Sequence, residues 1–96
     1  MSYDELKQQV VDKLIGAGFN LEGDTYVRVE TKRTQVVING HESVQEQKVY
    51  FRFSIIGEGA IDDKVTVGLN LKVNNADEGD FWIGQPSDLQ TFFGIR

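Results

Sequence analysis

The sequence predicts a single α+β domain over residues 1–96. We expect an N-terminal helix packed on an antiparallel β-meander of three to four strands, with a long protruding hairpin and a short C-terminal helix. Three observations lead to this prediction. Apolar residues recur at helical spacing after Ser2, residues 47–73 alternate between apolar and polar side chains, and Asn39-Gly40 is a hairpin signal between two strand-like runs. The composition, 40% hydrophobic and 26% charged, is that of an ordinary globular domain.

The charge and the absence of cysteine exclude several classes of function. The net charge is −5, from 15 acidic and 10 basic residues, so we do not expect broad sequence-independent binding to nucleic acid. Without cysteine, the chain forms no disulfides and no cysteine-rich metal sites. The acidic start of the chain differs from a secretory signal, and no apolar run approaches the roughly 20 residues of a membrane span. We therefore expect a cytoplasmic protein that does not bind a membrane.

The helix is predicted over about residues 3–16. Ser2 and Glu5 fit a capping box, in which each side chain satisfies a backbone donor of the first turn. Gly16 and Gly18 are suitable residues for ending the helix. The apolar positions that would cover the sheet recur every three or four residues: Tyr3, Leu6, Val10, Leu14 and Ala17.

The sheet is organised around two strands in residues 47–73. If the loop between them is Gly57–Asp63, Phe51 pairs with Leu69, Phe53 with Val67 and Ile55 with Val65, and no bulge is needed. An earlier strand begins at about Thr25, turns at Asn39-Gly40 and returns from His41 into the first of these strands. The predicted sheet core consists of Val27, Val29, Val49, Phe51, Phe53, Val67, Leu69 and Leu71, packed against Leu6, Val10 and Leu14.

The turn at Asn39-Gly40 conflicts with that core. A two-residue turn in strict register places Val27 opposite Arg52 and Val29 opposite Tyr50. We therefore predict a β-bulge within 31–34 or 43–47, or a three-residue loop at the tip.

Residues 32–47 extend beyond the predicted sheet, because its third strand should end near Val73, opposite Gln47. A two-stranded ribbon alone in water is marginally stable, so this hairpin must fold back on the body, pair with another chain or extend into solvent. It is where we first expect a partner. The predicted partner-binding residues are Val36, Val37, Ile38, Val44, Lys32 and Arg33.

The C-terminal third is predicted to be mostly irregular. Residues 74–80 form a polar acidic loop that lacks the ligand spacing of an EF-hand, and residues 81–83 form a short edge strand or fill the core. A short helix should begin at Pro86 or Ser87, with Leu89, Phe92 and Phe93 packing inward before Gly94.

Two other surfaces are candidates for binding. Aromatic and arginine side chains on the sheet face away from the core could stack on bases or anchor a protein; the alternative is that a C-terminal segment covers them. This second surface consists of Tyr26, Arg28, Tyr50 and Arg52. An acidic end of the sheet could meet a basic partner; the alternative is that acidic residues simply suit turns. It consists of Glu22, Asp24, Glu58, Asp62 and Asp63.

No catalytic signature is present, so we expect no enzyme activity, no cofactor and no metal. His41 is the only histidine and lies beside a turn, and no nucleophile has a readable base. The predicted function is non-enzymatic protein binding by a small acidic accessory or inhibitor protein of mobile-element or phage type. The alternative is a structural subunit that self-assembles, for example as a homodimer, through the hairpin. A third hypothesis is local nucleic-acid or nucleotide binding on the tyrosine and arginine face.

Overall fold

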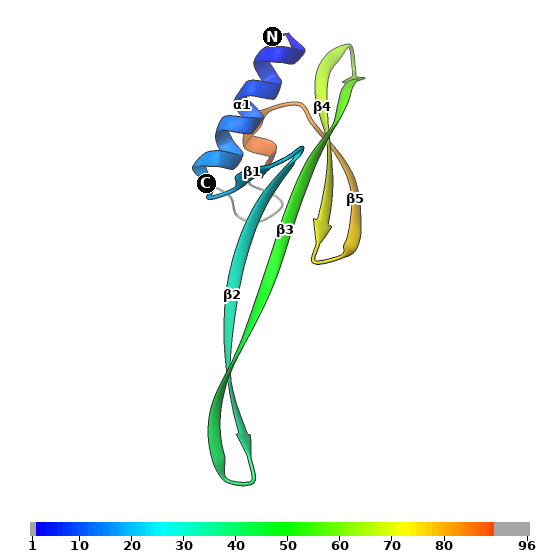
Figure 1. Cartoon of the computed structure of the whole chain (residues 1–96). Coiled ribbons are helices and arrows are strands. Elements are labelled where there is room, and N and C mark those ends of the chain that lie inside the picture. Colours follow the sequence, from blue (N-terminus) through cyan, green and yellow to red (C-terminus); the bar gives the residue numbers. More distant parts are fainter. Residues whose placement is uncertain (1, 90–96) are drawn as a thin grey trace.

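The structure, a computed structural model that describes residues 2–89, is an α+β fold, as predicted (Figure 1). Its elements are α1 (Tyr3–Gly16), β1 (Asn20–Glu22), β2 (Thr25–Ile38), β3 (His41–Ile61), β4 (Lys64–Val73), β5 (Ala76–Ile83) and the 3-10 turn η1 (Pro86–Leu89). The prediction of three to four strands is wrong, because the sheet has five within the described residues. In the described part of the chain a 3-10 turn replaces the predicted C-terminal helix. The expected packing of Phe92 and Phe93 before Gly94 lies outside the described residues.

Helix α1 begins and ends where the capping signals place it. The Ser2 hydroxyl oxygen accepts a hydrogen bond from the backbone N–H of Glu5 at 3.2 Å, which satisfies a donor of the first turn. After the last turn, Gly18 adopts a φ of 94° and the N–H of Phe19 donates to the carbonyl of Leu14. The predicted helix over residues 3–16 is confirmed. No helix within residues 2–89 is long and apolar enough to cross a membrane.

The five strands form one antiparallel sheet in sequence order, and α1 covers one face of it (Figure 1). The core lies between the helix and that face, around Phe53, whose ring centroid is 5.4 Å from that of Phe19. Its buried members are Leu6, Val10, Leu14, Phe19, Tyr26, Phe53, Val67, Leu69, Leu71, Ile83 and Leu89. This core lies at the end of the sheet away from the Asn39-Gly40 turn.

The hairpin of β2 and β3 keeps strict register throughout. Asn39 and Gly40 both adopt positive φ, Ile38 pairs with His41, and the ladder continues without a shift to Thr25 opposite Ser54. The predicted bulge within 31–34 or 43–47, or three-residue loop, is therefore wrong.

Strict register is possible because β2 turns its even-numbered residues, and not its odd-numbered ones, toward the core. Tyr26, rather than Val27, pairs with Phe53 and enters the core. Val27 is buried on the opposite face, opposite Arg52, and Val29 is exposed. The prediction that Val29 is a core residue is wrong, because the strict register places it on the face away from Phe53, where it is 47% exposed.

A bulge is present instead in the body of the sheet. Phe53 pairs with Leu71 and Ile55 with Leu69, and the register shifts between Ile55 and Gly57. The predicted pairs (Phe51–Leu69, Phe53–Val67 and Ile55–Val65) are wrong, as is the Gly57–Asp63 loop. Strand β3 runs on to Ile61, and only Asp62 and Asp63, both at positive φ, form the turn.

Two segments outside the predicted strands also form strands. Residues 20–24 contain β1, which pairs with the start of β2 around a turn at Gly23-Asp24. Most of the predicted 74–80 loop belongs to β5. A shift beside Leu71 in that strand brings Asp77 under the N–H of Gly79 at 2.8 Å and the side-chain amide of Asn70 at 2.9 Å. These donors, the backbone N–H first, lower the pKa of the Asp77 carboxylate.

The molecule is elongated, because β2 and β3 extend far beyond the rest of the sheet (Figure 1). It measures 61 × 24 × 22 Å and has a radius of gyration of 16.8 Å. A compact domain of this length would have a radius of gyration of about 12.5 Å. Since β4 ends at Val73 opposite Phe51, and not opposite Gln47 as predicted, the unsupported part of the hairpin is longer than expected.

Candidate functional site

We call residues 28–49 the arm: β2 from Arg28, the turn at Asn39-Gly40, and β3 as far as Val49. On the outer side of β2, the pairing with β1 ends at Val27. On the outer side of β3, the pairing with β4 ends at Phe51. Within the described part of the chain, the two strands of the arm therefore pair only with each other. Both outer backbone edges are open, a template on which further strands pair.

The open edge of β3 has a defined end at Asn74, in the turn between β4 and β5. The backbone N–H of Tyr50 donates to the side-chain oxygen of Asn74 at 3.1 Å, and the N–H of Asn74 donates to the carbonyl of Tyr50 at 2.8 Å. Backbone groups alternate between the two sides of a strand. The residues of β3 that present N–H and C=O groups to the open edge are therefore the even-numbered ones beyond Tyr50: Lys48, Glu46, Val44 and Glu42.

The arm carries all six predicted partner-binding residues but divides them between two faces. Arg33, Val37 and Val44 lie on one face, and Lys32, Val36 and Ile38 lie on the other, as their pairing partners in β2 and β3 require. All residues from Val37 to Lys48 are exposed, His41 among them. The arm is therefore a thin ribbon with apolar side chains on both sides.

Cross-strand contacts hold the two strands of the arm together. On the face of Val44, Arg33 and Glu46 form an ion pair of 3.0 Å, and the Gln35 amide donates to the Glu42 carboxylate at 3.2 Å. Exposed contacts of this kind each contribute only a few tenths of a kcal/mol, up to about 1 kcal/mol. They fix the strand register rather than adding much stability.

The predicted second surface is not one surface. Tyr26 lies in the core, so the prediction that it points away from the core is wrong. Arg28 is on the core side of the sheet, opposite Phe51, and forms an ion pair of 3.2 Å with Glu30. Only two of the four residues, Tyr50 and Arg52, share the other face.

Tyr50 and Arg52 attach the base of the arm to the body. The Arg52 guanidinium carbon is 5.1 Å from the centroid of the Tyr50 ring, a cation–π contact. The same guanidinium donates to the carbonyl of Asn74 at 2.8 Å. Both side chains therefore have structural contacts at the point where β4 ends.

The predicted acidic end is divided between two turns. Glu22 precedes the β1–β2 turn and Asp24 lies in it, whereas Asp62 and Asp63 form the β3–β4 turn. Strand β3 continues beyond the end of β2 as far as Ile61, which separates these turns by roughly 20 Å at about 3.3 Å per residue. Glu58 lies on β3 between them. Within residues 2–89, no three His, Cys, Asp or Glu side chains lie together as a metal ion would require.

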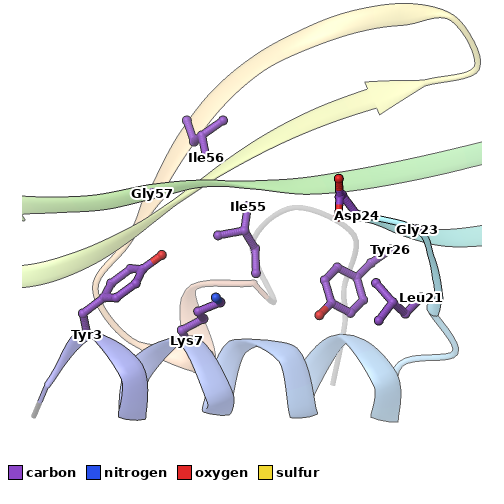
Figure 2. A pocket seen from close by; sticks show the side chains of 9 residues that line it. All are labelled: Tyr3, Lys7, Leu21, Gly23, Asp24, Tyr26, Ile55, Ile56 and Gly57. Atoms are coloured by element: carbon purple, nitrogen blue, oxygen red, sulfur yellow. The ribbon is translucent and has the colours of Figure 1, made fainter.

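A groove that the sequence did not reveal lies between α1, the start of β2 and the bulge of β3 (Figure 2). Its volume is about 520 Å³. Tyr3 and Lys7 reach it from the helix, Tyr26 lies on its other side, and Ile55 points between them, whereas Ile56 points away (Figure 2). The groove depends on the bulge after Ile55, which strand alternation alone does not predict. Its mixed aromatic, aliphatic and charged lining favours no single ligand chemistry.

A second unpredicted surface lies on the sheet face opposite α1, around Trp82. The indole is 47% exposed and lies directly over two glycines, Gly59 and Gly68. A Cβ on Gly59 would stand 2.6 Å from the ring and one on Gly68 would stand 2.7 Å from it. Thr66, beside them, is 3% exposed, and its hydroxyl has no hydrogen-bond partner among the described residues.

Comparisons of the chain with protein-family models, with curated proteins and with solved structures find no match. The arm, the groove and the Trp82 surface are therefore interpreted from their own geometry.

Proposed function

We propose that the chain is a non-enzymatic protein-binding module that acts through its arm. One observation carries this proposal: β2 from Arg28 and β3 as far as Val49 pair only with each other within residues 2–89, so both edges are open to a further strand. Addition of a strand to an exposed edge is a recurrent mode of protein recognition, in which backbone hydrogen bonds supply affinity and alternate side chains supply specificity.

The side chains of the arm support the same function. Val37 and Val44 are 62% and 64% exposed, the largest exposures among the large apolar residues of the described chain, and Ile38 beside them is 56% exposed. Val37 and Val44 are diagonal neighbours on one face, since Val44 pairs with Gln35, two positions before Val37. A partner lying along the arm would cover this pair.

The arm is also preformed, which favours binding. The ion pair between Arg33 and Glu46 and the hydrogen bond between Gln35 and Glu42 fix the ribbon in one register. A partner strand therefore meets an ordered edge, and less conformational entropy is lost on association than with a disordered segment.

The biological role we propose is that of a small acidic accessory or inhibitor protein, of mobile-element or phage type, that acts in the cytoplasm. The net charge of −5 and the small size support this class by analogy only. In this role the arm is the binding element, and the body holds the base of the arm.

The test is capture of a partner from the organism that encodes the chain. The variant Val37→Lys/Val44→Glu should lose the captured partner and keep the circular dichroism of the native fold, because both side chains are exposed and lie far from the core. The matched control, Ile15→Lys/Leu21→Glu, makes the same changes at exposed apolar positions of the body and should retain the partner. Capture by the folded arm variant equal to that by the control would refute the proposed function.

A further inference from the structure

The two edges of the arm differ in the side chains that they would bring together. Along β3 the open edge runs from His41 to Val49, between the hairpin turn and the position closed by Asn74. Along β2 it runs from Arg28 to Ile38. The edges are chemically unequal, because β3 carries Glu42, Glu46 and Lys48, whereas β2 carries Arg28, Glu30, Lys32 and Arg33.

We infer that the arm's partner is a second copy of this chain, which pairs antiparallel along the open edge of β3 about a two-fold axis at Gln45. This inference rests on the proposed function of the arm. In the arrangement, His41 of one copy lies opposite Val49 of the other, so the whole open edge is used. Strand β3 of each copy begins at His41, one position short of Tyr50 of the other copy, where the Asn74 side chain closes the edge.

The backbone of β3 fits this arrangement. Its outward-facing residues are the even-numbered ones, and a two-fold axis at Gln45 pairs even residues with even residues. Glu42 lies opposite Lys48 of the second copy, and Val44 lies opposite Glu46. Each of these pairs exchanges both its N–H···O bonds, as hydrogen-bonded pairs of an antiparallel ladder do. Gln45 lies opposite Gln45 of the second copy, in a non-hydrogen-bonded pair.

Charge selects this register over its neighbours. With the axis at Gln45, Glu42 of each copy lies opposite Lys48 of the other, which gives two opposite-charge pairs. A shift of two residues in one direction places Glu42 opposite Glu46, and a shift in the other direction places Glu46 opposite itself. Like charges directly opposite each other destabilise a ladder. A shift of one residue is excluded, because it would turn the outward backbone groups of one copy against the inward groups of the other.

The same pairing is unfavourable on the other edge. The β2 edge from Arg28 to Ile38 has its centre at Arg33, so a two-fold pairing over its full length places Arg33 opposite Arg33. In a dimer joined through β3, both β2 edges remain outside, where Lys32 and Arg33 hinder the addition of further strands. The two arms together form a four-stranded sheet, and the dimer has closed two-fold symmetry, the commonest form of homo-oligomer.

The test is disulfide cross-linking of the full chain, which has no native cysteine. Non-hydrogen-bonded antiparallel pairs have Cα atoms about 4.5 Å apart, within the range in which disulfides form. Gln45→Cys should therefore form a disulfide-linked dimer under mild oxidation. The matched control is Ser43→Cys, on the same face of the same strand. It should remain unlinked, because Ser43 lies opposite Gln47 of the second copy.

Charge reversal provides an independent measurement by sedimentation. Glu42→Lys should raise the dimer dissociation constant about tenfold or more, since it makes both charge pairs repulsive, and Glu42→Lys/Lys48→Glu should restore it. Glu78→Lys/Lys72→Glu exchanges the same charges at exposed positions of the body and should leave the dissociation constant unchanged.

Other outcomes overturn the inference. Equal cross-linking of Gln45→Cys and Ser43→Cys, or none of either, would overturn the self-pairing. So would a growing series of oligomers, the result of joining β2 of one copy to β3 of the next. If Gln45→Cys stays unlinked while Val37→Lys/Val44→Glu still abolishes capture of another protein, the second copy is the wrong partner and the proposed function stands. If capture also survives those changes, both fail.

Discussion

Strands β2 and β3 run through both the body and the arm, but other elements flank and cover them only in the body. In the body, β3 lies between β2 and β4 and beneath α1, and Phe53 is fully buried. In the arm, the same strands continue in unbroken register, no third strand or helix among residues 2–89 lies beside them, and Val44 is 64% exposed. The difference shows that neighbours, and not the alternation within a strand, decide whether an apolar residue is core or surface.

The largest expected effect is in the body. Phe53→Ala removes the side chain at the centre of the core and should lower the free energy of unfolding by about 3–5 kcal/mol, the range for buried aromatic residues. Chemical denaturation with unfolding followed by circular dichroism measures it. A loss below about 1 kcal/mol would mean that the helix and sheet do not pack around Phe53.

One substitution made in both regions sharpens the comparison. Val67→Ala, at a fully buried position, should cost about 2 kcal/mol, whereas Val44→Ala in the arm should change the free energy of unfolding by no more than about 0.5 kcal/mol. The two losses are to be compared in dilute solution, where an arm-mediated dimer is dissociated. Equal losses would show that the arm is packed against the body.

The glycines beneath Trp82 give a coupled effect of intermediate size. Gly68→Ala would place a Cβ 2.7 Å from the indole and 2.8 Å from the Ile56 side chain. We expect it to cost about 1–3 kcal/mol, as overpacking does, and less in a Trp82→Ala background. A double-mutant cycle measures the coupling. Equal costs in the two backgrounds would mean that the ring does not press on this glycine.

The smallest expected effect is the pH dependence of Asp77. Because its folded pKa is below the usual value of 3.8, its contribution to stability is complete above the unfolded pKa and is lost as the pH falls through the folded pKa. The denaturation midpoints of the native chain and Asp77→Asn should therefore differ by a small constant amount above about pH 5 and converge in stronger acid. A difference that persists unchanged to pH 2 would exclude this origin.

Structural features that depend on a few neighbouring residues could be predicted from the sequence. The helix follows from the capping pair Ser2 and Glu5 and the spacing of its apolar residues, and the turn residues Asn39 and Gly40 were identified from their tolerance of positive φ. Those features depend on contacts between residues that are close in the sequence, so the local sequence is enough to predict them.

Register and faces could not be predicted, because they depend on which residues meet across the sheet. Tyr26 and Val27 are adjacent and both can be buried, so the sequence does not say which of them faces Phe53. Choosing Val27 led to a predicted bulge in the arm, whereas the bulge occurs after Ile55. Gly59 was interpreted as a loop residue, although it leaves space for the Trp82 ring. A glycine within a strand pattern often marks such a close approach.

Residue-resolved amide hydrogen exchange of the arm at two protein concentrations tests the central claim most directly. In dilute solution, the inward-facing amides of Ser43, Gln45 and Gln47 should exchange more slowly than the outward-facing amides of Glu42, Val44, Glu46 and Lys48. At high concentration, those outward amides of β3 should become protected, while the outward amides of β2 at Arg33 and Gln35 stay fast. Equal exchange of odd and even positions of β3 at every concentration would contradict the account, as would protection that appears on β2 instead.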